Sequence, residues 1–117
     1  MADELPDSFI EKVRTAVKRV NPDKFLLGEV WEDATTKFGF DKRRTYLLGK
    51  GLDSVMNYPF KNAVLGFVCG RDAGQTMTDI LTLCEHYPAP ALDTALNFLS
   101  THDTERALTV IADEPAS

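Results

Sequence analysis

A nearly continuous apolar run, FLLGEVW at residues 25–31, constrains the fold of this chain more than any other segment. Its apolar side chains do not alternate with polar ones, as they do in a strand with one face in water. Continuous apolar character is typical of a strand buried on both faces, as in a parallel sheet covered by helices. A helical pattern precedes the run, so helix, turn and buried strand in succession predict an α/β fold.

The helical pattern covers residues 6–20. Apolar residues recur there at helical spacing, and the charged residues between them, including Arg14 and Lys18, are expected to face solvent. Pro6 suits the first turn of a helix, and Pro22 cannot continue one. The segment therefore predicts one amphipathic helix.

Short apolar runs and helical periodicity predict the remaining elements. Two more strands are expected at residues 54–58 and 95–99. Further helices are expected at residues 60–67, about 73–86 and 105–111. Pro59 is expected to end the second strand, and the Tyr-Pro-Ala-Pro segment at 87–90 to end the helix before it.

Residues 32–52 form the least regular stretch. They contain several glycines and the charge run DKRR at residues 41–44. A loop of this length is uncommon inside a compact domain and is often functional. We expect an irregular loop here, with the charge run in solvent.

Composition excludes several classes of function. The chain has 117 residues, a net charge of −5 and a pI near 4.9, so it is a poor partner for nucleic acid or an anionic membrane. No apolar run approaches the ~20 residues of a bilayer span. No signal-peptide pattern opens the chain, from which we expect a cytoplasmic protein. Cys69 and Cys84 lack metal spacing, and we expect neither a metal nor a cofactor.

Two polar clusters follow predicted strands. Glu29 lies near the end of the first strand beside Trp31, and His102 and Asp103 directly follow the third. In α/β proteins ligands bind outside the carboxyl ends of strands, so both clusters fall where a site is expected. A carboxylate beside an aromatic side chain suits general-acid catalysis. The alternative is that Glu29 has a capping role and that the His-Asp pair forms a turn with a local hydrogen bond.

Four segments resemble the α-amylase superfamily of glycoside hydrolases, in that family's order. GEVW at residues 28–31 resembles the general-acid segment, and FLSTHDT at 98–104 resembles the later His-Asp motif. DSVMNYPF at 53–60 is similar to the intervening strand of the neopullulanase and cyclomaltodextrinase branch. ADELP at 2–6 is similar to the residues directly after the nucleophile in the motif Arg-Leu-Asp-Val-Ala-Asp-Glu.

The resemblance implies catalytic roles for three residues. Glu29 would be the acid/base, which protonates the glycosidic oxygen and then deprotonates the incoming water. Asp103 would bind sugar hydroxyls and stabilise the oxocarbenium-like transition state without forming a bond. His102 would form a hydrogen bond with a hydroxyl of the same sugar.

Other residues would bind the glucan chain. The resemblance gives Trp31 and Tyr58 as stacking surfaces for sugar rings, although both could equally pack between strand and helix. Glu4 would lie near the aglycone side. Asp53 and Asn57 would line the cleft or serve at a strand end or turn.

The implied fold is a partial (β/α)8 barrel, roughly the fourth helix through the seventh strand and the start of the following helix. Three short parallel strands with covering helices would form a single catalytic subdomain over residues 1–117, since a complete barrel needs about 250 residues. Such a slice leaves two open sheet edges. We therefore expect a homo-oligomer that covers them.

The implied parent is a retaining α-glucan hydrolase that acts on starch-derived oligosaccharides. Retention requires two carboxylates about 5–5.5 Å apart. Alignment with the nucleophile motif places Met1 one residue after the nucleophilic aspartate, so we expect this chain to carry the acid but to lack turnover by itself. A non-catalytic carbohydrate-binding or interaction protein, or a truncated reading frame without function, are the alternatives.

Overall fold

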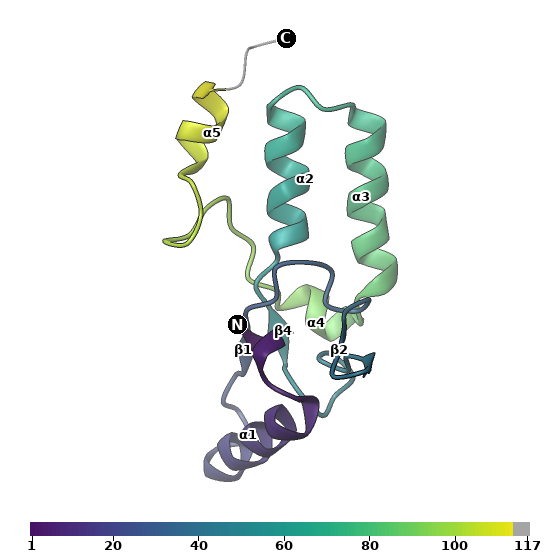
Figure 1. The fold of residues 1–117 in the computed structure, drawn as a ribbon, viewed down its shortest axis with the longest axis vertical. Helices are drawn as coiled ribbons and strands as arrows, with labels where there is room; N and C mark the ends of the chain where they lie inside the picture. Colours follow the sequence, from purple (N-terminus) through teal and green to yellow (C-terminus); the bar gives the residue numbers. More distant parts are fainter. Residues whose placement is uncertain (114–117) are drawn as a thin grey trace.

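The computed structural model describes residues 1–113. Its helices are η1 (Ala2–Glu4, a 3-10 helix), α1 (Asp7–Val20), α2 (Tyr58–Val68), α3 (Ala73–His86), α4 (Ala89–Asp93) and α5 (Ala107–Asp113). Its strands are β1 (Leu27–Gly28), β2 (Phe38–Gly39), β3 (Lys42–Arg43) and β4 (Ser54–Val55). Figure 1 shows these elements along the chain.

The parallel sheet joins segments that are distant in the sequence. β1 pairs with β4 in parallel, with Leu27 opposite Ser54. Met56 then forms an isolated parallel bridge to Leu96. The predicted α/β fold with parallel strands is thus confirmed. The third segment is a single bridge rather than the strand expected at 95–99, because backbone bonds to β4 and its extension reach only Leu96.

The N-terminal segment lies along the other edge of β1. The carbonyls of Leu26 and Gly28 accept hydrogen bonds from the β4 side, from the N–H groups of Ser54 and Met56. In a parallel ladder the intervening residues face the opposite edge. There the carbonyl of Glu29 accepts the N–H of Ala2 at 3.0 Å. β1 therefore lies between β4 and the start of the chain.

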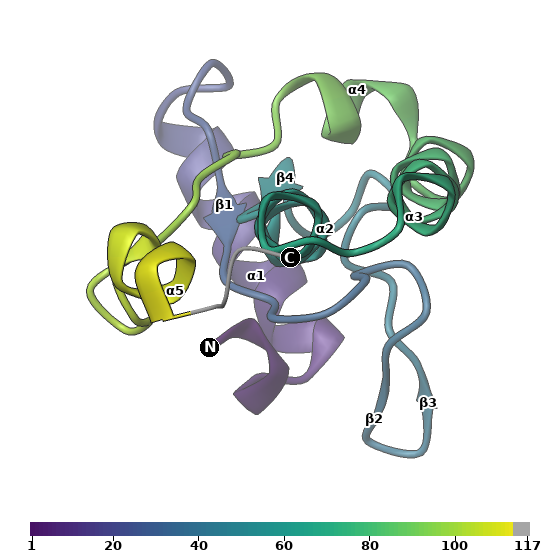
Figure 2. The same ribbon diagram turned by 90° about the horizontal axis from the view of Figure 1, so that it is seen from above.

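The helices flank the two ends of the strands. Figures 1 and 2 show α2 rising from the end of β4, with α3 returning beside it and α5 on the other side of α2. α1 crosses beneath the opposite end of the strands. Within residues 1–113 no helix has both the length and the apolar character to cross a bilayer.

Prolines open helices in this fold. α2 begins at Tyr58, earlier than predicted, because the side chain of Asn57 accepts the N–H of Phe60 and caps the helix. Pro59 lies in its first turn, where a missing N–H costs nothing. Pro90 lies likewise in the first turn of α4, a helix that the sequence did not predict. By contrast, α1 and α3 match their predicted ranges closely.

The expectation of an irregular loop over residues 32–52 was wrong in part. β2 and β3 form an antiparallel hairpin inside it. Phe40 and Asp41 make its two-residue turn, with φ of 52° and 63°. Two consecutive positive φ values are typical of a type I′ turn. Phe-Asp lacks the Asn-Gly signature of such turns, so no local pattern predicts this hairpin.

The charge run was also expected in solvent, but Arg44 is 3% exposed. Its Nε donates to Asp7 Oδ1 at 2.8 Å, and its other nitrogens donate to the carbonyls of Asp3 and Leu5. Burial raises the pKa of Asp7, but the hydrogen bond from Arg44 and further donors outweigh it and lower that pKa. Full pairing makes the burial of this charge tolerable. Arg44 thereby joins the N-terminal segment to the hairpin region.

Asp53 holds α1 beneath the sheet. Its carboxylate accepts hydrogen bonds from Arg14 and Lys18 of α1, each at 2.8 Å. It also accepts the N–H of Leu26 at 2.8 Å. Arg14 and Lys18 therefore do not simply face solvent as predicted. Asp53 precedes β4, at the amino end of the strands, so it serves at a strand end and does not line a cleft.

Asp53→Asn is expected to lower the free energy of unfolding by about 2 kcal/mol near neutral pH. Burial raises the pKa of Asp53, but bonds from Lys18, the Leu26 N–H and Arg14 outweigh it and lower the pKa from 3.8 to about 2. The stabilisation is present above the unfolded pKa and is lost as the pH falls through the folded value. Urea unfolding at neutral and strongly acidic pH measures it.

The exposed Asp23→Asn serves as the matched control and is expected to change little at either pH. An equal loss for Asp53→Asn at both pH values would mean that the charge of Asp53 contributes nothing.

Candidate active site

Three aromatic side chains gather where the parallel segments end. Trp31 follows β1, Tyr58 follows β4 and Phe98 follows the bridge at Leu96. The rings of Trp31 and Tyr58 stack with centroids 4.5 Å apart and planes 15° from parallel. Phe98 meets Tyr58 edge-on at 4.7 Å. Phe98 opens the FLSTHDT segment, but its packing role has no signal in the sequence, because it depends on a contact across the sheet.

Tyr58 is a packing residue in this structure. It is 2% exposed, between Trp31 and Phe98, so its ring is closed to a sugar. This is the packing alternative that the sequence left open. Trp31 is partly exposed, with one face of its ring on Tyr58.

Two asparagines tie the second and third segments together. Asn57 is buried, and its Nδ2 donates to Asn97 Oδ1 at 3.1 Å. Its Oδ1 accepts the N–H of Phe60 at 3.2 Å. One side chain thus caps α2 and holds the segment that leads toward Asp103. Asn97 carries no sequence signal of this role.

Glu29 follows β1 directly, at the carboxyl end of the strand. Its side chain is 25% exposed, and its Oε1 lies 3.8 Å from the amino nitrogen of Met1. Within residues 1–113 no hydrogen bond ties up this carboxylate. The carboxylate of Glu29 is therefore accessible to a ligand at the strand ends.

His102 and Asp103 lie in an exposed turn. Their side chains are 88% and 47% exposed, and His102 Nε2 lies 3.1 Å from Asp103 Oδ2. The N–H of Asp103 donates to Thr101 Oγ1 at 3.2 Å. This is the local turn that the sequence allowed as an alternative, and no ion pair or hydrogen bond of the described residues joins it to Glu29. Glu4, in η1, is also exposed.

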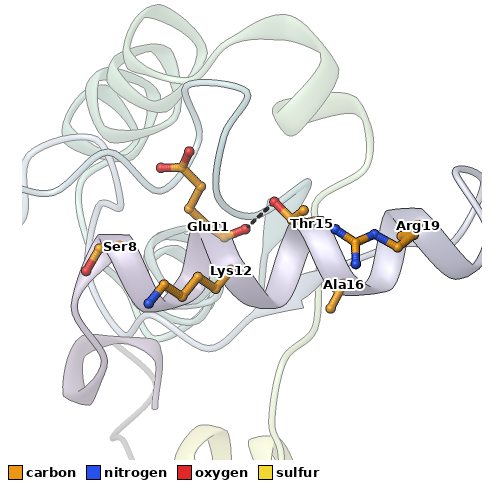
Figure 3. A pocket seen from close by; sticks show the side chains of 6 residues that line it. All are labelled: Ser8, Glu11, Lys12, Thr15, Ala16 and Arg19. Atoms are coloured by element: carbon orange, nitrogen blue, oxygen red, sulfur yellow. Dashed lines mark hydrogen bonds between the residues drawn. The ribbon is translucent and has the colours of Figure 1, made fainter.

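Two further features of residues 1–113 were compared with the strand ends as possible sites, a metal centre and a hollow on α1. Residues 1–113 contain no group of three or more His, Cys, Asp or Glu placed to hold a metal ion. Figure 3 shows a hollow whose six lining side chains all come from α1, at the other end of the strands. A hollow over a single helix encloses no ligand, so the strand ends remain the candidate site.

Removing the hydroxyl of Tyr58 is expected to leave the stability unchanged or to raise it. This buried hydroxyl has no hydrogen-bond partner in the described residues, so Tyr58→Phe removes only an unfavourable group. Tyr87→Phe is the matched comparison, because the Tyr87 oxygen accepts the buried N–H of Ala34 at 3.1 Å. Tyr87→Phe is expected to lower the free energy of unfolding by about 1–2 kcal/mol.

Urea unfolding of both variants measures the difference. An equal loss for Tyr58→Phe would show that its hydroxyl does have a partner in solution.

Comparison with known proteins places this arrangement in a family. Residues 4–117 match the model of the alpha amylase catalytic domain. A cyclomaltodextrinase of Geobacillus thermopakistaniensis is 36% identical over 94% of this chain and 18% of its own length. Neopullulanase 2 of Thermoactinomyces vulgaris is 36% identical over 93% of this chain and 17% of its own length. The chain thus spans under a fifth of these relatives.

Solved structures agree. A cyclomaltodextrinase structure, 36% identical, superposes with a TM-score of 0.82 over 97% of this chain and 18% of that one. The cyclic alpha-maltosyl-(1→6)-maltose hydrolase of Arthrobacter globiformis, complexed with that sugar, gives 0.81 at 32% identity over 92% of this chain and 23% of that one. With its motifs in order, its parallel strands aligned and its catalytic-domain match, the chain belongs to the α-amylase family of glycoside hydrolases.

Proposed function

We propose that this chain supplies the general acid/base of a retaining α-glucan hydrolase that acts on starch-derived oligosaccharides. One observation carries the proposal: the carboxylate of Glu29, partly exposed and in contact only with the amino nitrogen of Met1 among the charged groups of the described residues, lies at the carboxyl end of β1, between β4 and the N-terminal segment. Relatives named cyclomaltodextrinase and neopullulanase support a glucan substrate for the parent.

Glu29 would act in two steps. Its protonated carboxyl group gives a proton to the glycosidic oxygen, so the leaving sugar departs as a neutral alcohol. The resulting carboxylate then takes a proton from the water that releases the second sugar. Partial exposure of the side chain keeps it accessible to that water.

The second carboxylate, which would act as the nucleophile, is best placed along the edge of β1 that faces the N-terminal segment. Among the nearby candidates, Asp3 is bound to Tyr46 and Lys37, and Asp53 lies at the wrong end of the strands. Met1 nitrogen lies 3.8 Å from Glu29 Oε1. A residue joined to that nitrogen would reach the ~5–5.5 Å separation that retention requires. This supports a nucleophile one residue before Met1 in the parent, and a chain of 117 residues without turnover.

Asp103 and His102 would bind the sugar at the cleavage point. Both side chains are open to a ligand, and they contact each other. The carboxylate of Asp103 would accept hydrogen bonds from sugar hydroxyls that strengthen as positive charge develops on the ring. We assign Glu4 to the aglycone side and Trp31 to a sugar-stacking role in the same proposal.

Glu29→Gln is expected to lower the rate of the parent enzyme on maltooligosaccharides by about two to four orders of magnitude, because the variant lacks the general acid. Glu32→Gln is the matched control, because Glu32 is exposed and paired with Lys37 at 2.7 Å. Release of reducing sugar measures both. The chain of 117 residues is expected to release none.

Two outcomes contradict these assignments. A parent enzyme that keeps its rate in Glu29→Gln has a different acid. Reducing sugar released by the short chain, and lost in Glu29→Gln, would refute the expected lack of turnover.

We also propose that copies of this chain associate. Leu96 and Leu99 are 46% and 43% exposed, and Leu96 ends the parallel sheet. An open sheet edge with apolar side chains favours pairing with another chain. Light scattering after size-exclusion chromatography is expected to show a dimer or larger species that Leu96→Ser weakens. Val20→Ser on α1, where Val20 is 83% exposed, is the control. A stable monomer overturns the proposal.

A further inference from the structure

A pocket opens between the segment after β1, the β2–β3 hairpin with the residues that follow it, and the C-terminal end of α3. Ala34, Arg43 and His86 come from these three parts of the chain. In Figure 1 the hairpin lies just below the end of α3. The pocket measures about 270 Å³, near the lower end of the range of small-ligand sites. Its lining includes none of the residues of the candidate active site.

Apolar side chains form much of the lining. They are those of Ala34, Leu47, Leu48 and Pro88. Ala34 and Leu47 are buried, whereas Leu48 is 69% exposed. A ligand that covers this exposed leucine removes apolar surface from water, which is favourable. The pocket therefore favours a ligand with an apolar body.

Two of the three basic side chains in the lining already have acidic partners. Arg44 Nε lies 2.8 Å from Asp7 Oδ1, and His86 Nδ1 lies 2.7 Å from Asp33 Oδ2. The two threonine hydroxyls of the lining donate to the same carboxylates, at 3.3 Å and 2.6 Å. No carboxylate belongs to the lining itself. These groups therefore leave little for a ligand to bind.

Arg43 is the basic side chain of the lining whose charge is not balanced. Its Nε donates to the carbonyl of Thr35 at 2.9 Å, which holds the guanidinium against the segment after β1. Within residues 1–113 its two terminal nitrogens have no hydrogen-bond partner, and no carboxylate lies within salt-bridge distance of them. The pocket thus combines an apolar lining with one guanidinium that can still donate to an anion.

We propose that this pocket binds a small monocarboxylate with an apolar body. The terminal nitrogens of Arg43 donate to the two carboxylate oxygens, the planar pairing that suits a guanidinium best. The apolar body of the ligand lies against Leu48 and Pro88. One unbalanced positive charge matches one negative charge. This site is separate from the proposed function, and neither depends on the other.

Phenylacetate is the probe, because it joins one carboxylate to an apolar ring. It is titrated into the 117-residue chain while the backbone amide signals are followed by NMR. Saturable shifts are expected at Ala34 and Leu48. Arg43→Gln is expected to weaken the affinity about tenfold, because the hydrogen bonds to a charged group are lost. Lys42→Gln removes an equal charge from the neighbouring exposed residue of β3, outside the lining, and is expected to change the affinity little.

Two further ligands separate the parts of the site. Phenylacetamide keeps the ring but carries no charge, so it is expected to bind more weakly than phenylacetate and equally well in Arg43→Gln. Inorganic phosphate has charge but no apolar body, and is expected to give no saturable shifts. Leu48→Ser is expected to weaken phenylacetate and phenylacetamide alike.

Three outcomes overturn the site. The first is the absence of saturable shifts with phenylacetate. The second is an equal loss of affinity in Arg43→Gln and Lys42→Gln, which would mean a general effect of charge. The third is binding of phenylacetamide or phosphate as tight as that of phenylacetate. Circular dichroism confirms that each variant is folded, and the comparison of the three ligands needs no variant.

Discussion

The parallel pairing of β1 with β4 determines which residues lie at each end of the strands. Leu27 faces Ser54, so Glu29 and Tyr58 leave the sheet at the same end, although they are far apart in the sequence. The same register places Asp53 at the opposite end, where it holds α1. The ladder thus separates the carboxylate of Asp53, at the amino end of the strands, from the candidate site around Glu29 at their carboxyl end. Because this ladder has few backbone hydrogen bonds, the contacts of Asp53 with α1 and the stacking of Trp31 on Tyr58 also hold the elements in place.

Hydrophobic periodicity and helix-ending residues predicted the helices that form from contacts between residues close in sequence. α1 and α3 have clear periodicity and definite ends, so their ranges were predicted closely. Prolines misled the prediction for α2 and α4, because proline breaks a helix interior but suits a first turn. The β2–β3 hairpin was missed because Phe40, unlike glycine or asparagine, rarely adopts the left-handed conformation that its turn demands.

The candidate site divides in the same way. The position of Glu29 at a strand end follows from the apolar run before it, and motif order indicated the family. The bond between Asn57 and Asn97, and the packing of Tyr58 between two rings, depend on which strands become neighbours. Arg44 illustrates the limit most clearly: a residue in a charge run became buried because partners near the start of the chain satisfy its guanidinium. No local window of sequence contains that information.

The helix pair α2–α3 contributes no strand to the sheet, yet it rises from the end at which Glu29 lies (Figure 1). Beyond the first turn of α2, where Tyr58 packs on Trp31, its residues can therefore change without altering the pairing of β1 with β4. Substitutions can reshape the wall beside the strand ends while the carboxylate of Glu29 stays in place. Under the proposed function, this separation lets the sugars that fit beside the strand ends vary independently of the residue that transfers the proton.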